Sequence, residues 1–198
     1  MKRLFSSLIF AAVTALALTA CGSGDSAGDG GGDFNDADVT FAQSMIPHHE
    51  QAVEMAKMAK MHAATPEVKN LADKIESAQG PEIATMKGWL KDWGKDESSD
   101  DSMGGMDHGS GDSGDSGDSG MDMPGMMSDA DMAALDKATG AGFDQMFLNM
   151  MIEHHTGAIE MAKTEQSKGK NADAKALAKQ IEADQNAEIA AMKELLTP

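Results

Sequence analysis

One short motif occurs twice in the chain, as Met45-Ile46-Pro47-His48-His49 and as Met151-Ile152-Glu153-His154-His155. Imidazole nitrogen and thioether sulfur are both metal ligands, and thioether sulfur prefers Cu(I). Residues three and four positions apart are neighbours on a helix, so each methionine faces the two histidines that follow it. The motif therefore predicts a copper-binding element in each half of the chain.

Further sulfur atoms are available near the motifs and between them. Met55, Met150 and Met161 lie on the same predicted helices, although a single helical methionine is more often a core residue than a metal ligand. Between the motifs, the large apolar residues of a Gly-, Ser- and Asp-rich tract are all methionine, which packing does not explain. The candidate ligands in this tract are Met103, Met106, His108, Met121, Met123, Met126 and Met127.

Apolar residues at three- and four-residue spacings predict the helices that carry these side chains. Pro47 predicts a kink in the first helix, Gly80-Pro81 an interruption of the second, and Gly140-Ala141-Gly142 a turn. The predicted helices span residues 36–62, 66–94, 128–139, 143–166 and 172–196.

The two halves of the sequence are related by a shift of 106 positions, as from His48 to His154. Roughly two in five positions between Asp38 and Leu90 are identical under this shift, so the repeat should govern the fold. Each half reads as a helical hairpin, and two hairpins predict an all-α four-helix bundle with pseudo-twofold symmetry. The predicted domain spans 36–198, with repeats at 36–94 and 128–198 and a disordered linker at 95–127.

The repeat also preserves polar positions, which suggests a supporting role for them around a ligand. An unpaired amide on the apolar stripe of a helix is costly, so Gln79 and Gln185 should bond to a histidine across the bundle. That contact would orient the ring for metal binding. The predicted supporting residues are Gln79, Gln185, Glu76 and Glu182, and Glu82 and Glu188 are also repeated.

The N-terminal residues have the features of an export signal. Lys2 and Arg3 precede a short apolar run, and Leu18-Thr19-Ala20-Cys21 is similar to a bacterial lipobox. The resemblance implies cleavage after residue 20 and lipidation of Cys21, the only cysteine. We therefore expect a signal peptide at 1–20, a flexible tether at 21–35, and a lipid-anchored protein outside the cytoplasm.

The formal net charge of −17 limits the partners that the protein can have. Such an acidic chain repels nucleic acid and anionic lipid surfaces, and it attracts cations. Because there is no second cysteine, no disulfide can form within the chain. Metal ions are therefore the expected partners, with contact to a membrane only through the lipid anchor.

The motif in its context resembles a known family. Phe41-x-x-x-Met45-Ile46-Pro47-His48-His49-x-x-Ala52-x-x-Met55-Ala56 is similar to the signature of the bacterial domain of unknown function 305, and Phe147 to Ala162 repeats it. The resemblance implies a ferritin-like fold. It also implies a role in copper handling at the cell envelope, since one member is a periplasmic copper-binding resistance protein.

Together these features predict an exported, lipid-anchored protein that buffers or sequesters copper, mainly Cu(I), although imidazole also accepts Cu(II). A copper transporter or oxidase is a candidate partner, and no nucleophile suggests an enzyme. A di-iron oxidase or peroxidase is one alternative, but its Glu-x-x-His element is missing, because Met or Ile stands three residues before each histidine. A metal-free surface interaction module is another. The sequence does not determine the oligomeric state. It also does not determine whether the two motifs form one shared metal site or two separate sites.

Overall fold

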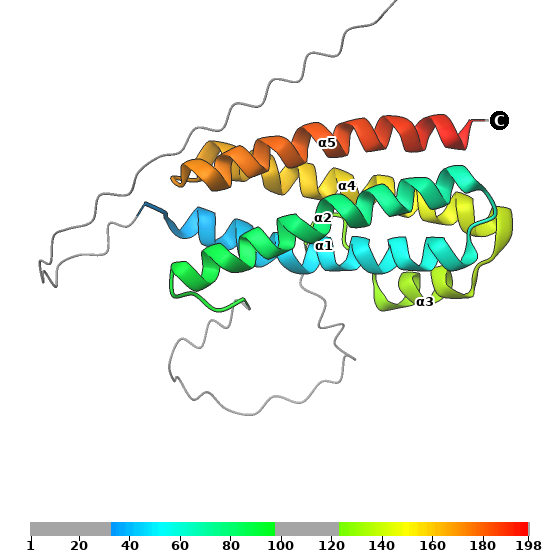
Figure 1. Ribbon diagram of the computed structural model, residues 1–198, viewed down its shortest axis with the longest axis horizontal. Helices are drawn as coiled ribbons and strands as arrows, with labels where there is room; N and C mark the ends of the chain where they lie inside the picture. Colours follow the sequence, from blue (N-terminus) through cyan, green and yellow to red (C-terminus); the bar gives the residue numbers. More distant parts are fainter. Residues whose placement is uncertain (1–32, 98–122, 198) are drawn as a thin grey trace, which may run out of the picture. The chain divides into compact units, whose positions relative to one another are not determined.

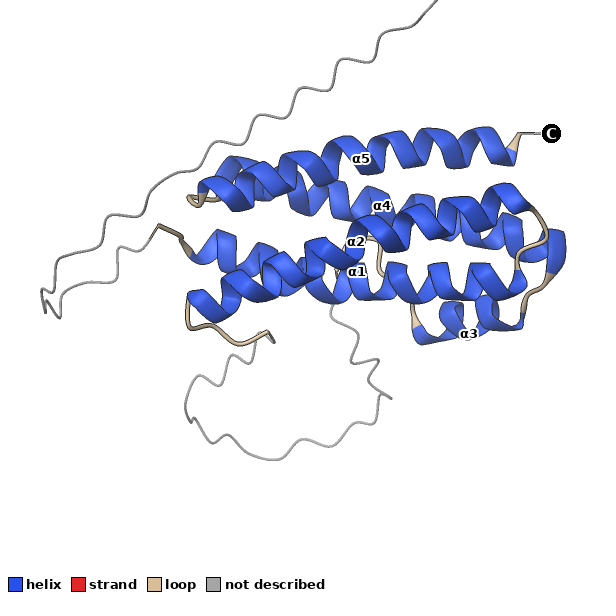
Figure 2. Ribbon diagram, in the orientation of Figure 1, coloured by secondary structure: helices blue, strands red, loops and turns tan. Residues whose placement is uncertain are grey.

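The computed structural model describes residues 33–97 and 123–197, and in these stretches it contains helices and no strands (Figure 2). The predicted all-α fold is therefore confirmed. The helices are α1 (Asp36–His62), α2 (Pro66–Asp92), α3 (Asp129–Lys137), α4 (Gly140–Lys168) and α5 (Ala172–Leu196). None of them is long and apolar enough to cross a membrane. The predictions for the signal peptide, Cys21, Met103, Met106, His108 and Met121 fall outside the described residues.

Four of the five described helices begin after a residue whose side chain caps the first turn. The Asn35 side chain accepts hydrogen bonds from the backbone N–H groups of Ala37 and Asp38, and so begins α1. Side chains also cap three other helices, because each satisfies backbone N–H groups that the first turn leaves free. These caps are Thr65 for α2, Ser128 for α3 and Asn171 for α5.

The predicted interruption at Gly80-Pro81 is wrong, because both residues lie within a continuous α2. α1 also continues through Pro47, the position of the predicted kink. The turn predicted at residues 140–142 is limited to Gly140, with φ of 63°, and α4 already starts there. A glycine costs a helix only about 1 kcal/mol, and complete burial of Phe143 within the first turn outweighs that cost.

The four long helices form two hairpins, α1 with α2 and α4 with α5, and the hairpins meet mainly through α1 and α4 (Figure 1). α1 and α4 run antiparallel. The Asn35 amide at the start of α1 donates to the Lys168 carbonyl at the end of α4 over 3.0 Å, and Ala63 after α1 lies beside Gly140. The short α3 packs on α1 and α4. This arrangement is the predicted bundle of two hairpins, and α3 corresponds to the short helix predicted at residues 128–139.

Two buried aspartates show that the sequence repeat is also a structural twofold. Asp38 of α1 accepts hydrogen bonds from the backbone N–H groups of Lys170 and Asn171, just before α5. Its counterpart Asp144 of α4 accepts from the N–H groups of Ala64 and Thr65, just before α2. Each carboxylate therefore ties its own helix to the connecting loop of the other hairpin.

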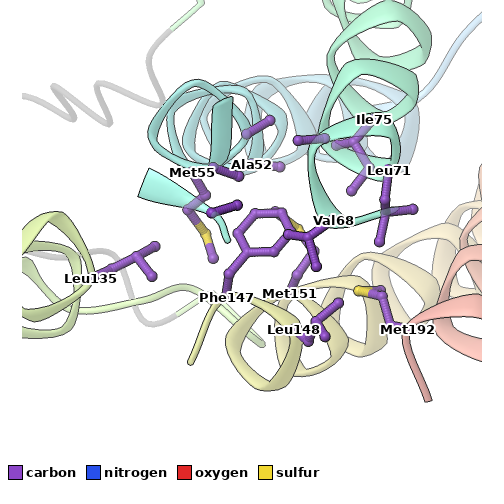
Figure 3. Packing of buried hydrophobic residues seen from close by; sticks show 14 of the residues in the cluster. Ala52, Met55, Val68, Leu71, Ile75, Leu135, Phe147, Leu148, Met151 and Met192 are labelled. Atoms are coloured by element: carbon purple, nitrogen blue, oxygen red, sulfur yellow. The ribbon is translucent and has the colours of Figure 1, made fainter. Parts of the chain in front are cut away.

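The core consists of two apolar clusters. The Phe41 cluster joins the first half of α1 to the last half of α4, and includes Met45, Ala158 and Ala162. The Phe147 cluster joins the other halves of the same helices, under α2 and α3. Figure 3 shows side chains of several helices meeting around Phe147. Since α1 and α4 are antiparallel, residues 48–49 and 154–155 fall between the two clusters.

Candidate metal centre

Four histidines, one pair from each motif, form a buried polar layer between the two apolar clusters. His48 and His49 belong to α1, His154 and His155 belong to α4, and each is 0% exposed. The rings of His48 and His154 are in contact, with centroids 3.7 Å apart and planes inclined by 40°. Because these two residues are counterparts in the repeat, the pseudo-twofold axis passes between them. The two motifs therefore meet in one layer.

The outer histidines are hydrogen-bonded to carboxylates. His49 Nε2 lies 2.8 Å from Glu82 Oε2 of α2, and His155 Nε2 lies 2.6 Å from Glu188 Oε2 of α5. An ionised carboxylate only accepts hydrogen bonds, so each ring donates from Nε2 and a neutral ring keeps a free lone pair on Nδ1. Histidines that bind metals usually donate their second nitrogen to a carboxylate in this way.

The inner histidines leave more nitrogen atoms unpaired. His48 Nε2 donates to the Pro124 carbonyl oxygen over 3.0 Å, whereas neither nitrogen of His154 has a hydrogen-bond partner in the described part of the chain. The Nδ1 atoms of the other three histidines are also unpaired and buried. Buried polar atoms normally have partners, and leaving them without one is costly. These nitrogen atoms therefore fit a bound metal ion better than a purely structural core.

Burial keeps the inner imidazoles neutral. It lowers the pKa of His48 to about 3, against the opposing effect of the Pro124 hydrogen bond. Burial also lowers the pKa of His154 well below its usual value, and the neighbouring His48 and His155 add to that effect. A ligand that is already deprotonated does not compete with protons for a metal. Metal binding by these two residues should therefore not weaken near pH 6–6.5, where an exposed imidazole gains its proton.

Sulfur atoms lie on both sides of the histidine layer. Met45 belongs to the Phe41 cluster, Met151 belongs to the Phe147 cluster, and both are 0% exposed. Each precedes its histidine pair by one helical turn, so both are well placed to extend a metal site. The other predicted methionines of the helices are Met55, buried in the Phe147 cluster, Met150, partly buried against it, and Met161, partly buried against the Phe41 cluster.

Three methionines of the predicted linker belong to the described residues 123–127. Met127 is buried in the Phe147 cluster, and Met123 and Met126 are half-buried. The Pro124 carbonyl that accepts from His48 belongs to the same segment. This end of the linker is therefore packed on the bundle next to the histidines.

The predicted supporting role of the glutamines is wrong. Gln79 and Gln185 are buried, but their amides make no hydrogen bond to any histidine or to another described group. Glu76 instead binds Lys60, and Glu182 binds Gln166, within each hairpin and away from the histidines. The residues that do orient histidines, Glu82 and Glu188, were visible in the sequence as repeated acids three positions after each glutamine.

The donor set suits copper better than a pair of iron ions. Within residues 33–97 and 123–197, no three His, Cys, Asp or Glu side chains are gathered to hold a metal ion by themselves. A di-iron centre needs four carboxylates and two histidines around the ions. Glu82 and Glu188 are instead engaged as hydrogen-bond acceptors at the edge of the layer. Neutral imidazole with neighbouring thioether is a typical ligand set for copper.

Comparison with known proteins agrees with this geometry. The family model described as Domain of unknown function (DUF305) matches residues 38–196. The crystal structure of a putative secreted DUF305 protein from Streptomyces coelicolor is 34% identical with a TM-score of 0.68, and the match covers 81% of this chain and 90% of that one. A DUF305 fragment from Deinococcus radiodurans is 28% identical with a TM-score of 0.67, covering 82% and 96%.

A third similar structure is described as CopM in the Cu(I)-bound form. It is 31% identical with a TM-score of 0.60, and the match covers 80% of this chain and 94% of that one. Structures of CopM in Cu(II)-bound and Ag-bound forms also match. A search of curated protein sequences gives no match. The extent of the family match shows that this chain belongs to the DUF305 family.

Proposed function

We propose that this protein binds copper in the histidine layer between α1 and α4. The contact between the rings of His48 and His154 carries the proposal, because it brings the two motifs together around unpaired, neutral nitrogen atoms. Met45 and Met151 are the candidate sulfur ligands on either side. Since the pseudo-twofold axis passes through the layer, the motifs make one shared centre rather than two separate sites.

Cu(I) is the favoured oxidation state. Thioether sulfur is a soft ligand that prefers Cu(I), whereas imidazole also accepts Cu(II). The similar CopM structures are described as Cu(I)-, Cu(II)- and Ag-bound, which supports a site that accepts soft monovalent ions. The net charge of −17 favours binding of both Cu(I) and Cu(II), because it attracts cations.

The protein acts outside the cytoplasm as a copper buffer held at the membrane through a lipid on Cys21. A relative described as a putative secreted protein supports export. The lipobox-like residues support the lipid anchor. In this position the bundle would take up copper before it reaches sensitive targets, and a copper transporter or oxidase would be the partner that supplies or receives it.

Replacing both central histidines tests the proposed site. The H48A/H154A protein should lose its tightest Cu(I) equivalent when it competes with a colorimetric Cu(I) chelator under anaerobic conditions. His62→Ala is the matched control, because His62 lies on α1 beside α3, outside the layer, with 26% of its side chain exposed. Affinity that the double substitution leaves unchanged would contradict the proposed site. A wild-type protein that binds no copper at all would instead favour the metal-free interaction module.

A further inference from the structure

Residues 123–127, which we call the strap, lie across the histidine layer. The Pro124 carbonyl accepts the hydrogen bond from His48, and Gly125 lies against the backbone of α4 at His154. Gly125 has φ of 78°, and a Cβ there would stand 2.6 Å from the Glu153 carbonyl oxygen. Only glycine fits such a position without strain. The strap therefore touches both central histidines.

The two central helices hold the strap at counterpart positions. Gln51 of α1 makes two hydrogen bonds to the backbone of Met127. Its side-chain NH₂ donates to the Met127 carbonyl over 2.9 Å, and its side-chain oxygen accepts from the Met127 N–H over 2.8 Å. The counterpart of Gln51 in α4 is Gly157. A Cβ at Gly157 would stand 1.8 Å from the Pro124 oxygen, so the strap fits only because this position has no side chain.

A groove of about 440 Å³ lies between the first half of α1 and the last half of α4, and Pro124 forms part of its wall. Ser44, which also lines the groove, is one turn before His48. This end of the groove therefore adjoins the histidine layer. The residues that line it include several with an oxygen or sulfur atom in the side chain, namely Thr40, Ser44, Glu160, Met161 and Thr164.

Among the described residues, no helix other than α1 and α4 lines the groove, whereas α3 packs on the related half of the α1–α4 face. Phe41 and Thr164 of the groove correspond, by the shift of 106, to Phe147 and Met58. Those two residues pack in the cluster that contains Leu135 of α3. On that half of the α1–α4 face α3 covers the core. On the other half, within the described residues, Pro124 of the strap both lines the groove and accepts the hydrogen bond from His48.

We propose that copper reaches the His48–His154 pair through this groove, and that the strap is the gate at its inner end. The inference rests on the proposed copper site. Lifting the strap breaks the hydrogen bond between His48 and Pro124 and also separates Gly125 from the backbone of α4 at His154. The strap also makes the repeats unequal, because it fixes the ring of His48 and leaves that of His154 without a partner among the described residues.

Gly157→Ala tests the gate, because the added methyl group displaces the strap at Pro124. Transfer of Cu(I) from a chelator should become severalfold faster, and the ¹⁵N signal of His48 Nε2 should show loss of its hydrogen bond. Gln51→Ala removes both hydrogen bonds to Met127 without adding bulk, so it should also speed the transfer of Cu(I) and change the His48 signal. Gly88→Ala is the control, since nothing lies within 4 Å of its added carbon.

An unchanged or slower transfer in variants whose His48 signal has changed would overturn the gate. A wild-type His48 signal in both variants would overturn it too, because the strap would then not be held by these contacts. Neither result would affect the proposed copper site. That site fails only if the wild-type protein takes up no Cu(I), or if H48A/H154A binds it with wild-type affinity.

Thr164→Trp tests the groove by filling it. Uptake of Cu(I) should slow severalfold while the equilibrium affinity stays the same, because the histidines are untouched. Thr85→Trp is the control: Thr85 is also an exposed helical threonine bonded to the carbonyl four residues earlier, but it does not line the groove. Equal uptake rates in the two tryptophan variants would overturn the access route.

Discussion

Glu165→Gln should make the protein more stable, and the gain should depend on pH. Glu165 of α4 is 1% exposed and faces Asp38, which the backbone N–H groups of Asn35, Lys170 and Asn171 already satisfy. Burial, followed by the hydrogen bond to Asp38, raises the pKa of Glu165 from 4.5 to about 8. Burial raises the pKa of Asp38 as well, but these hydrogen bonds outweigh it and the net shift is downward.

The sign of the effect follows from these pKa values. Below pH 4.5, Glu165 is protonated in both the folded and the unfolded chain, so its ionisation does not lower the free energy of unfolding. As the pH rises from 4.5 to about 8, the unfolded chain releases the proton first, so the free energy of unfolding falls. At 1.36 kcal/mol per pH unit, the loss reaches about 3 kcal/mol at pH 7. Glutamine keeps an N–H donor for Asp38 and removes this loss.

Urea unfolding followed by the fluorescence of Trp89 and Trp93, which pack against the Phe41 cluster, measures the effect. Glu165→Gln should exceed the wild type by up to about 3 kcal/mol at pH 7 and match it near pH 4.5. Glu160→Gln, an exposed acid on the same helix, should stay within about 0.5 kcal/mol of the wild type at both values. A Glu165→Gln protein with the wild-type pH dependence would refute the reasoning.

Other parts of the structure lead to further expected outcomes. Replacing Glu82 or Glu188 by Gln should weaken copper affinity roughly 10-fold or more in a chelator competition, because each carboxylate orients a histidine. Leu135→Ala should lower the free energy of unfolding in urea by about 2–5 kcal/mol, because Leu135 fixes α3 on the core with 0% exposure. Burial lowers the pKa of His48 to about 3, so the Cu(I) affinity measured at pH 5 should equal that at pH 7.5. A loss of affinity with a midpoint near pH 6.5 would instead indicate a solvent-accessible ring.

The sequence predicts the fold well because the periodicity of each helix and the repeat of the two halves are both visible in the sequence alone. The cap residues Asn35 and Thr65 determine where α1 and α2 begin, and these residues can be recognised without a structure. Gly140-Ala141-Gly142 was misread because burial of Phe143, which extends α4, depends on the other helices. Local preference is a weak guide wherever packing opposes it.

The site is harder to predict because its contacts join residues far apart in the chain. The Pro124 carbonyl and His48 are 76 positions apart, and the sequence contains no pattern that links them. The contact that Asp38 makes with residues 170 and 171 has no sequence signal either, because an acid in the first turn of a helix is already explained by the helix dipole. The repeat paired His48 with His154, but only the antiparallel crossing of α1 and α4 shows that their rings touch.

X-ray absorption at the copper edge, recorded on the full chain with one equivalent of Cu(I), tests the central claim most directly. Binding in the histidine layer predicts scattering from at least one imidazole nitrogen together with thioether sulfur. The imidazole contribution should fall in H48A/H154A and stay unchanged in His62→Ala. A spectrum with sulfur ligands alone, unchanged by the double substitution, would place the copper among methionines elsewhere in the chain and contradict the account.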